Sequence, residues 1–443
     1  MTHNRKGSFN VSNNRIDQKY LMIETGASMQ KAVFLPKKET STVTPCGWMW
    51  LVSLAVLSLG CTDSGQPPVL SRQIGAAGSV QEGAASGATA GVGRFAGLSA
   101  DITPIEPPRV LEAVFVGDVM FGRYEEEGLE PNPPFVTEAF QYVAPLIAGA
   151  DAAVANLETP LLRDPFLTCP WPPRLRFVGT PAATEALAAA GFHGVNVANN
   201  HVFDMRNLGV RDTLSLLAEH RLFAVGAPVE KGEMPFVPVP FSAAGQTVAF
   251  IGVTTARNSV DGPTVPELPY TPEDANVPDL LAPVIEEARR TYDHVIVFAH
   301  WGIPDERAPT PERRDAARAL IDLGADAVIG HHPHVLQGIE IYNNGLIVYS
   351  LGDFLFDAMM DQRRLTGVLR VGFAPKSPCL DHVTFHPVAA MRAKGGGIVP
   401  RPAPGPLRRL AVQRLVDLSG EMGTRWEDDG NALHLVLPET CRQ

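Results

Sequence analysis

Carboxylate, amide and imidazole side chains recur along this sequence, each group directly after a short apolar run. The early groups are Asp118 and the pair Asn156 and Glu158, and the later ones are rich in histidine. The later groups comprise Asn199, Asn200, His201, His300, His331, His332 and His334. Oxygen and imidazole ligands without a thiolate are typical of sites for Mn, Fe or Zn, and fit Ca or Mg less well. The sequence therefore predicts a site for one or two divalent metal ions.

This ligand set predicts a chemistry as well as a metal site. A Glu and an Asp with several His can hold two ions about 3.5–4 Å apart, with one carboxylate bridging them. Such a pair activates a water and clamps phosphoryl or carbonyl oxygens. We therefore expect hydrolysis or group transfer at a phosphoester or an amide.

The apolar runs before these groups are expected to be buried strands. Their lengths and flanking residues predict strands at residues 110–116, 151–157, 194–198, 295–299 and 327–329. Ligands of α/β folds bind outside the carboxyl ends of the strands, so the polar groups should converge. Each group alone is also consistent with a turn, a helix cap or a hydrogen-bonded structural histidine. The ordered series argues against that interpretation.

The segments between these strands predict the rest of the fold. Helices are expected at residues 180–190, 208–220, 272–292, 311–323 and 407–418, and further strands at 247–253, 368–373 and 382–388. Asn343-Asn344-Gly345 between the apolar runs 339–342 and 346–350 predicts a β-hairpin. Strands that alternate with helices, followed by hairpins, predict an α/β layered fold with mixed sheets.

The first hundred residues differ from the rest. Residues 48–60 are an uncharged apolar run of signal-peptide length, which as a helix rises only about 20 Å and is too short to cross a bilayer. Gly60-Cys61 behind it resembles a bacterial lipoprotein cleavage site, so Cys61 is the expected lipidation site; ordinary secretion and a buried helix are the alternatives. We expect an N-terminal extension (1–61), a Gly-, Ala- and Ser-rich tether (62–108) and one globular domain (109–443), anchored to a membrane of the cell envelope.

Composition excludes several classes of protein. Lys and Arg number 37 against 48 Asp and Glu, a net charge of −11 without a long basic run, which argues against nucleic-acid binding. The hydrophobic content of 45% is that of a globular chain. Five cysteines are too few for a disulfide scaffold. Besides Cys61, only Cys169, Cys379 and Cys441 remain after processing, so at most one intramolecular disulfide is expected.

Six motifs in order resemble those of one family. They are GDVMFGR, NLETP, NVANNHVFD, VFAHWG, GHHPHVLQG and YSLGDFLFD, over roughly residues 110–390. In this order they resemble the CapA-type capsule-synthesis family, which is associated with poly-γ-glutamate capsules and has a calcineurin-like metallophosphatase fold. The resemblance implies a layered αββα sandwich with mixed sheets.

The resemblance also implies roles for single residues. The implied ligands of one ion are Asp118, Glu158 and His334, and those of the second are Glu158, Asn200, His300 and His332. The implied catalytic residues are His201, which would stabilise the leaving group or the transition state, and Asp118.

Two departures affect the site. Met120, a residue type that the capsule family itself tends to have there, stands where metallophosphatases of this fold have a ligand histidine, which puts the first metal position in question. Asp353 stands where the family usually has Asn. An extra carboxylate at residue 353 would either join the site or cap a turn.

The residues around these motifs are expected to have other roles. Arg123 and Asn156 are expected to bind substrate, and Arg174 and Arg176 are candidates for the same basic groove, with ordinary surface charge as the alternative. The stretch 305–307 is expected to be a solvated loop. The remaining histidines are expected to be structural.

Two functions remain open. The chain is either a metal-dependent hydrolase or transferase at the cell surface, or a non-catalytic component of a capsule polymer assembly or export complex with a remnant metal site. The expected substrate is a phosphoester or an anionic polymer such as poly-γ-glutamate, and no nucleic-acid partner is expected. The membrane would be reached through the lipid anchor.

Overall fold

The computed structural model describes residues 107–441, apart from gaps at 126–127, 132, 165–175, 231, 259–266, 358–359 and 394–395. The expected signal segment, Cys61 and nearly all of the expected tether lie outside the described residues. Within the described part of the chain, no helix combines the length and the hydrophobicity needed to cross a membrane.

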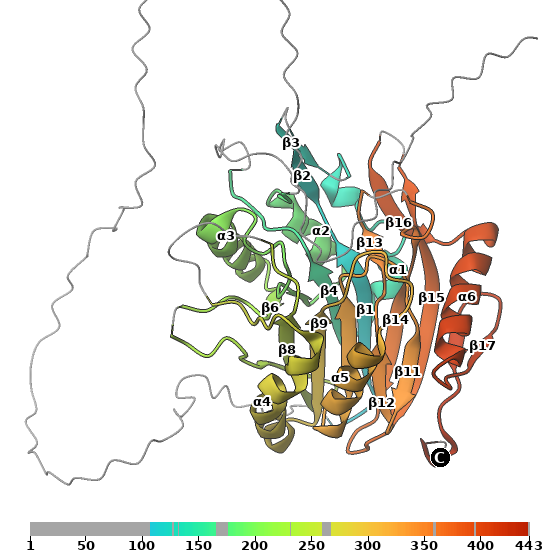
Figure 1. The fold of residues 1–443 in the computed structure, drawn as a ribbon. Coiled ribbons are helices and arrows are strands. Elements are labelled where there is room, and N and C mark those ends of the chain that lie inside the picture. Colours follow the sequence, from blue (N-terminus) through green and yellow to red (C-terminus); the bar gives the residue numbers. More distant parts are fainter. Residues whose placement is uncertain are drawn as a thin grey trace, which may run out of the picture. The chain divides into compact units, whose positions relative to one another are not determined.

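Two mixed β-sheets form the centre of the domain (Figure 1). The larger has ten strands in the order β17-β18-β15-β14-β1-β4-β5-β6, with β13 paired to β1 and β16 to β15. Its strands are β1 (Leu111–Val119), β4 (Ala152–Leu157), β5 (Gly194–Asn196), β6 (Phe223–Val225), β13 (Asp353–Leu355), β14 (Leu365–Phe373), β15 (Leu380–Arg392), β16 (Ile398–Pro402), β17 (Trp426–Asp428) and β18 (Leu433–Leu435). Strands β1, β4, β5 and β6 are parallel, whereas β14, β15, β18 and β17 are antiparallel to their neighbours.

The second sheet has six strands in the order β11-β12-β10-β9-β8-β7. They are β7 (Val239–Ala243), β8 (Gln246–Thr254), β9 (His294–His300), β10 (Ala327–His331), β11 (Ile339–Tyr342) and β12 (Gly345–Val348). Strands β8, β9, β10 and β12 run parallel, and β9 is buried along its whole length, as expected of a central parallel strand. A separate ribbon pairs β2 (Gly122–Glu125) with β3 (Gly128–Pro131).

Helices cover the outer faces of both sheets. On the larger sheet these are α1 (Ala144–Ile147), α2 (Ala182–Ala190) and α3 (Arg206–Glu219); on the second sheet they are α4 (Val277–Thr291) and α5 (Pro311–Asp322). Helix α6 (Gly405–Gly420) packs beside β15 (Figure 1). Short 3₁₀ turns are η1 (Val136–Glu138), η2 (Asp274–Asn276) and η3 (Glu439–Cys441). Between the sheets, the rings of Phe115 and Phe298 lie 5.9 Å apart. The predicted αββα sandwich with mixed sheets is therefore confirmed.

Local signals explain where the elements begin and end. Helix α5 starts behind Thr310, whose side chain accepts a hydrogen bond from the Arg313 amide, and Pro311 fits the first helical turn. Asn343 and Asn344 have φ angles of 47° and 67°, so the predicted hairpin between β11 and β12 is confirmed. The predicted strands and helices are present with shifted ends. Among the strands that the structure describes, the sequence did not predict eight of three to five residues, which give little periodic signal: β2, β3, β6, β7, β13, β16, β17 and β18.

A close approach of two backbones brings β1 beside β13. A Cβ at Gly117 would lie 1.9 Å from the carbonyl oxygen of Gly352, so only glycine fits there. The Asp118 amide donates to that same oxygen at 2.9 Å, and Asp118 pairs in register with Asp353. This contact sets two carboxylates side by side at one edge of the larger sheet.

A disulfide between Cys379 and Cys441 ties the C-terminal turn η3 to the start of β15. It agrees with the expectation of at most one intramolecular bridge; Cys169 lies outside the described residues. Leu380 pairs with Phe373, and Phe373 pairs with Leu111 at the start of β1. The bridge therefore lies at the end of the larger sheet opposite to Asp118.

We expect the Cys379→Ser, Cys441→Ser double variant to lose about 2–4 kcal/mol of unfolding free energy, because the bridge closes a long loop in the unfolded chain. Denaturant unfolding with and without reductant measures this loss. Its metal content should equal that of the parent, because the bridge lies at the opposite end of the sheet. A fall in metal content would show that the bridge also supports the metal site.

Candidate metal centre

The carboxyl ends of strands from both sheets meet at one edge of the sandwich. This edge gathers the ends of β1, β4 and β5 from the larger sheet and of β9 and β10 from the second. The buried polar side chains there include Asp118, Asn156, Glu158, His201, His300, His331, His332, His334 and Asp353. The expected convergence of the sequence motifs is what the structure shows.

Glu158 lies at the centre of this group. Its side chain is fully buried, and neither carboxylate oxygen has a hydrogen-bond partner among the described residues. Three imidazoles face its Oε1: Nε2 of His201 at 3.7 Å, of His300 at 3.7 Å and of His334 at 3.9 Å. Burial raises the pKa of the Glu158 carboxyl well above its usual range, although His334 opposes the shift. A buried carboxylate without donors is costly, so this arrangement fits a cation held among these groups.

Asp118 is held as an anion by donors on several sides. Its Oδ1 accepts from Nδ2 of Asn156 at 2.9 Å and lies 3.0 Å from Nδ1 of His331. Its Oδ2 accepts from the His332 amide at 3.2 Å and lies 3.4 Å from Nδ1 of His334. Burial alone would raise the pKa of Asp118, but the hydrogen bonds from His331 and His334 hold it well below its usual range.

Asp353 joins the site and does not merely cap a turn. Its Oδ1 lies 2.8 Å from Nδ1 of His334, and its Oδ2 has no partner among the described residues. A carboxylate on one ring nitrogen of a histidine orients the other nitrogen toward a metal. Burial alone would lower the pKa of His334, but Asp353 and Glu158 raise it well above its usual range.

The His332-Pro333-His334 segment brings two imidazoles into the site by an unusual backbone. His332 and His334 have φ angles of 92° and 59°, so the segment is not extended. Non-glycine residues in this region are strained, and such strain often occurs at functional sites. His332 and His334 offer ligand atoms that lie, with an oxygen of Glu158, within 4.8 Å of one another.

Further groups of side chains have the spacing of metal ligands. Asp118, His334 and Asp353 form one such group, and Asp118, Glu158 and His300 form another. Asn200 approaches the same place, since its Oδ1 lies 2.9 Å from Nε2 of His300. The structure therefore brings together all six ligands that the resemblance implies and adds Asp353. The donor set of carboxylates, an amide oxygen and neutral imidazoles fits a divalent transition metal.

Asn156 has a different position from the one expected of a substrate-binding residue. Its side chain is fully buried and lies behind the ligands. Nδ2 donates to Asp118 and lies 3.2 Å from Nδ1 of His300, while Oδ1 accepts from Nδ2 of Asn196 at 2.9 Å. With its polar atoms engaged within the protein, Asn156 positions two ligands and does not face a substrate. Asn196, which the sequence did not single out, supports it from the end of β5.

His201 is oriented by a carboxylate that the sequence analysis missed. Nδ1 of His201 lies 2.6 Å from Oδ2 of Asp204, and that oxygen also accepts from the Phe177 amide at 2.7 Å. The Phe177 ring stacks on the imidazole at 3.8 Å between centroids. These contacts turn Nε2 of His201 toward Glu158. The available signal was the position of Asp204, three residues after His201 in the same motif.

The Phe177 ring contacts both Arg123 and His201. The Arg123 guanidinium forms a two-point ion pair with Asp357 and lies 4.8 Å from the centroid of Phe177, the ring that stacks on His201. Of its expected companions, Arg176 donates to the Asp204 carbonyl at 3.0 Å, whereas Arg174 lies outside the described residues.

Met120 forms an apolar wall beside the cluster. It is buried with Phe177 and Phe356, and the Phe356 ring lies 5.0 Å from that of His334. The Met120 sulfur accepts a contact from the Gly122 amide at 3.1 Å. Where the fold pattern has an imidazole, this chain therefore presents an apolar side chain.

The stretch 305–307 is a loop, as expected, but only Arg307 is exposed, whereas Asp305 and Glu306 are half-buried in ion pairs. Glu306 pairs with the buried Arg313, which also holds Asp274, and Asp305 pairs with Arg363. These ion pairs fix the loop that follows β9 because each joins it to another element. The sequence could not predict them, since the partners lie up to 58 positions away.

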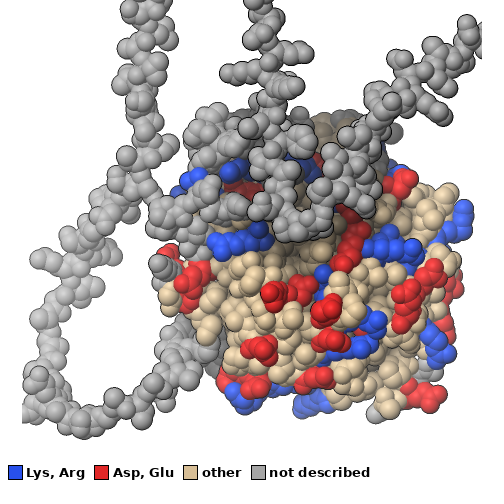
Figure 2. Space-filling view, in the orientation of Figure 1, with Lys and Arg blue, Asp and Glu red and all other residues tan. Residues whose placement is uncertain are grey.

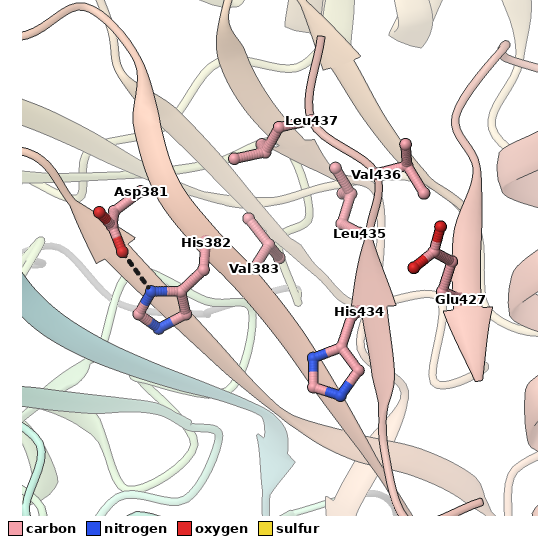
Figure 3. Close-up of a pocket in the computed structure, with 8 residues that line it drawn as sticks. All are labelled: Asp381, His382, Val383, Glu427, His434, Leu435, Val436 and Leu437. Carbon is pink, nitrogen blue, oxygen red and sulfur yellow. Dashed lines mark hydrogen bonds and ion pairs between the residues drawn. The ribbon is translucent and has the colours of Figure 1, made fainter. Parts of the chain in front are cut away.

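A surface cavity of about 330 Å³ lies elsewhere, where β18 diverges from β15 (Figure 3). Its lining consists of Asp381, His382, Val383, Glu427, His434, Leu435, Val436 and Leu437. His382 is bonded to Asp381 at 2.9 Å, and none of the described groups with metal-ligand spacing includes either cavity histidine.

Comparison with known proteins gives a family and named relatives. The family model described as bacterial capsule synthesis protein PGA_cap matches residues 112–358. The PGA biosynthesis protein CapA of Bacillus subtilis (strain 168) is 34% identical over 248 residues, which are 56% of this chain and 64% of that protein. The capsule biosynthesis protein CapA of Bacillus anthracis is 29% identical over 332 residues, which are 74% of this chain and 78% of that protein. The chain thus spans just under two thirds of the Bacillus subtilis relative.

Solved structures show a weaker likeness. A hypothetical protein from Thermus thermophilus has a TM-score of 0.36 at 17% identity and covers 66% of this chain and 98% of its own. The 5'-nucleotidase from Candida albicans SC5314 has a TM-score of 0.34 at 13% identity, and the match covers 59% of this chain and 47% of the nucleotidase. Likenesses of this size carry no functional conclusion.

Glu158→Gln should lower the metal content below that of the parent after expression with Mn, Fe and Zn supplied. The variant keeps the shape of the side chain and removes the charge that offsets a dication among neutral imidazoles. Elemental analysis of the purified full chain measures the effect. Equal metal content in both proteins, or none in the parent, would leave these side chains a structural role only.

Met120→His is the counterpart, because it replaces the apolar wall by the imidazole of the fold pattern. We expect its metal content to rise toward two ions per chain, measured in the same way. Unchanged content would mean that Met120 does not limit the occupancy of the site.

Proposed function

Because this chain belongs to the bacterial capsule synthesis protein family PGA_cap, we propose that it acts in capsule polymer synthesis as a metal-dependent hydrolase or transferase. The observation that carries the proposal is Glu158, a buried carboxylate without hydrogen-bond donors that three imidazoles face within 3.9 Å. His334 offsets its desolvation only in part, and a divalent cation would offset it further. The proposed substrate is a γ-glutamyl amide of the polymer, and a phosphoester is the alternative.

The proposed division of labour follows from the positions of the side chains. Asp118, Glu158, Asn200, His300, His332 and His334 would hold the ion or ions, with Asp353 as a further carboxylate. A divalent ion in such a site supplies Lewis acidity that polarises a carbonyl or phosphoryl oxygen and activates a water. Asn156 and Asp353 fix the orientation of the ligands that they touch, so the site is formed before the substrate binds.

His201 is the proposed proton donor to the leaving group. Asp204 accepts from its Nδ1, and the stacked Phe177 ring restricts its rotation, so Nε2 is presented toward the site. His201 belongs to none of the described groups with metal-ligand spacing. With its Nδ1–H held by Asp204, the ring would donate from Nε2 as the imidazolium, whose charge Asp204 stabilises, and a contribution of about 10²–10⁴-fold in rate is expected of a residue in this role.

One observation favours a second function. Met120 occupies the ligand position with an apolar side chain buried against Phe177 and Phe356. A site reduced to one ion, or to none, would suit a non-catalytic component of a capsule assembly or export complex. The two functions differ in whether the loaded protein turns over a substrate.

We expect the metal-loaded full chain to hydrolyse a γ-glutamyl peptide or a generic phosphoester. His201→Asn and Asp204→Asn should lower kcat by about 10²-fold or more while the metal content stays at the parent level. His220→Gln is the matched control, because among the described residues the hydrogen bond of this imidazole goes to the carbonyl of Leu216 in the preceding helical turn. Activity that survives chelation would contradict a metal-dependent enzyme, and no turnover by the loaded parent would favour the assembly role.

We further propose that the chain is exported and held at a membrane through a lipid on Cys61. The apolar run before Gly60-Cys61 supports this, and so does the disulfide between Cys379 and Cys441, because such bonds persist in oxidising compartments. The proposed partners are an anionic polymer and other components of a capsule synthesis complex, without nucleic acid. On the face with α4, α5 and α6, acidic and basic side chains are interspersed (Figure 2).

Cys61→Ser should release the protein from the membrane fraction, because the lipid would be its anchor. Fractionation of cells that express the parent and the variant, with mass spectrometry of the N-terminal peptide, measures this. A variant that still pellets with membranes, together with an unmodified Cys61 in the parent, would contradict the anchor.

A further inference from the structure

Two arginines near the metal ligands are each held in place by an aspartate. Arg123 presents its Nε and Nη2 to Asp357, and Arg363 presents the same two nitrogens to Asp305. In the second pair, the distances to the Asp305 oxygens are 2.7 and 2.6 Å. A two-point pair of this kind fixes the plane of a guanidinium, so both cations have a defined direction.

The two pairs connect to the cluster through different residues. Arg123 lies over Phe177, and Phe177 stacks on His201. The other pair connects to the segment that carries His332 and His334. The Asp305 amide donates to the carbonyl of Pro333, the residue between His332 and His334, at 2.9 Å.

Each guanidinium keeps one nitrogen for a further acceptor. Within the part of the chain that the structure describes, Nη1 of neither Arg123 nor Arg363 has a hydrogen-bond acceptor. The Arg363 side chain is 16% exposed and that of Arg123 is 25% exposed, so both are partly shielded from water. Asp305 is the main cause that raises the pKa of Arg363, and Asp353 and Glu158 add to it, which places this cation within electrostatic reach of the site.

The charge of the chain makes these cations necessary for a polyanionic substrate. A net charge of −11 repels such a polymer unless cations are fixed where it binds. Arg313, which is also close in sequence to the site, is buried and held by both Asp274 and Glu306, so it cannot serve. Arg123 and Arg363 are partly exposed and retain donor capacity.

We propose that Arg123 and Arg363 form a clamp that binds two anionic groups of one extended substrate whose reacting bond lies at the metal ligands. The substrate class is a linear polymer whose repeating unit carries a carboxylate. A phosphomonoester has a single anionic group and could not bind both arginines and the metal ligands at once. The inference rests on the proposed function for the position of the reacting bond, but binding is measured separately from turnover.

The test measures binding of γ-linked glutamate oligomers of two to eight units to the full chain, after removal of metal by a chelator. Calorimetry gives Kd for the parent and for Arg123→Gln and Arg363→Gln. Each variant should weaken binding of the longer oligomers by about five- to tenfold, because each loses one charge-assisted hydrogen bond. The double variant should show the product of the two effects, and oligomers with amidated carboxylates should bind none of the proteins.

Arg109→Gln is the matched control. Arg109 forms an equivalent two-point pair with Asp151 at 2.8 and 2.6 Å, but at the start of β4, the end of the sheet opposite to the site. It should leave the affinity for the oligomers unchanged. If Arg363→Gln does not fold, Arg363→Lys keeps the charge and should retain part of the affinity while losing the two-point geometry.

The clamp would be overturned if the parent and both arginine variants bound the oligomers equally and the variants showed only a lower melting temperature. The two ion pairs would then serve only to stabilise the loops that they connect. Oligomer binding that depends on both arginines without any turnover by the metal-loaded protein would support the clamp and refute the enzyme. Turnover that neither arginine substitution changes would support the enzyme and refute the clamp.

Discussion

The burial of the Glu158 carboxylate is the constraint on which the rest of this site depends. A carboxylate removed from water and left without donors costs several kcal/mol unless a positive charge compensates it. The protein surrounds Glu158 with His201, His300 and His334, each too distant for a direct hydrogen bond, so a cation bound among them could contact the carboxylate and the imidazoles together. The αββα sandwich supplies the rigidity that holds these groups apart, because each stands at the end of a buried strand or directly after it.

Residues behind the ligands complete this arrangement. Asn156 fixes Asp118 and His300 together, and Asp353 fixes His334. Gly117 makes the second of these contacts possible, because only the absence of a side chain lets β1 approach the segment before β13. Asp204 orients His201 in the same way. His201 faces the cluster but belongs to none of the described groups of potential ligands. The site thus combines a metal-binding part with a separately oriented proton donor.

The sequence predicted the parts of this account that depend on local order, and it missed those that depend on contacts between distant residues. Strand ends followed by polar residues predicted the convergence of Asp118, Glu158, His300 and His332, because parallel strands share one direction. The supporting role of Asn156 was not predictable, since the residue type and its place after a strand are the same for a substrate-binding side chain. The ion pairs of Asp305 and Glu306 were missed for a similar reason. Two adjacent acidic residues in a loop indicate a solvated segment, and only the fold shows that Arg363 and Arg313 lie beside them.

Anomalous X-ray scattering from crystals of the full chain grown with Mn, measured at the Mn absorption edge, tests the central claim most directly. The account predicts a peak within bonding distance of an oxygen of Glu158 and of a nitrogen of at least one of His300, His332 and His334. A crystal with Mn in solution but no peak within bonding distance of Glu158, and with water donating to its carboxylate, would contradict the claim that this buried charge exists to hold a metal.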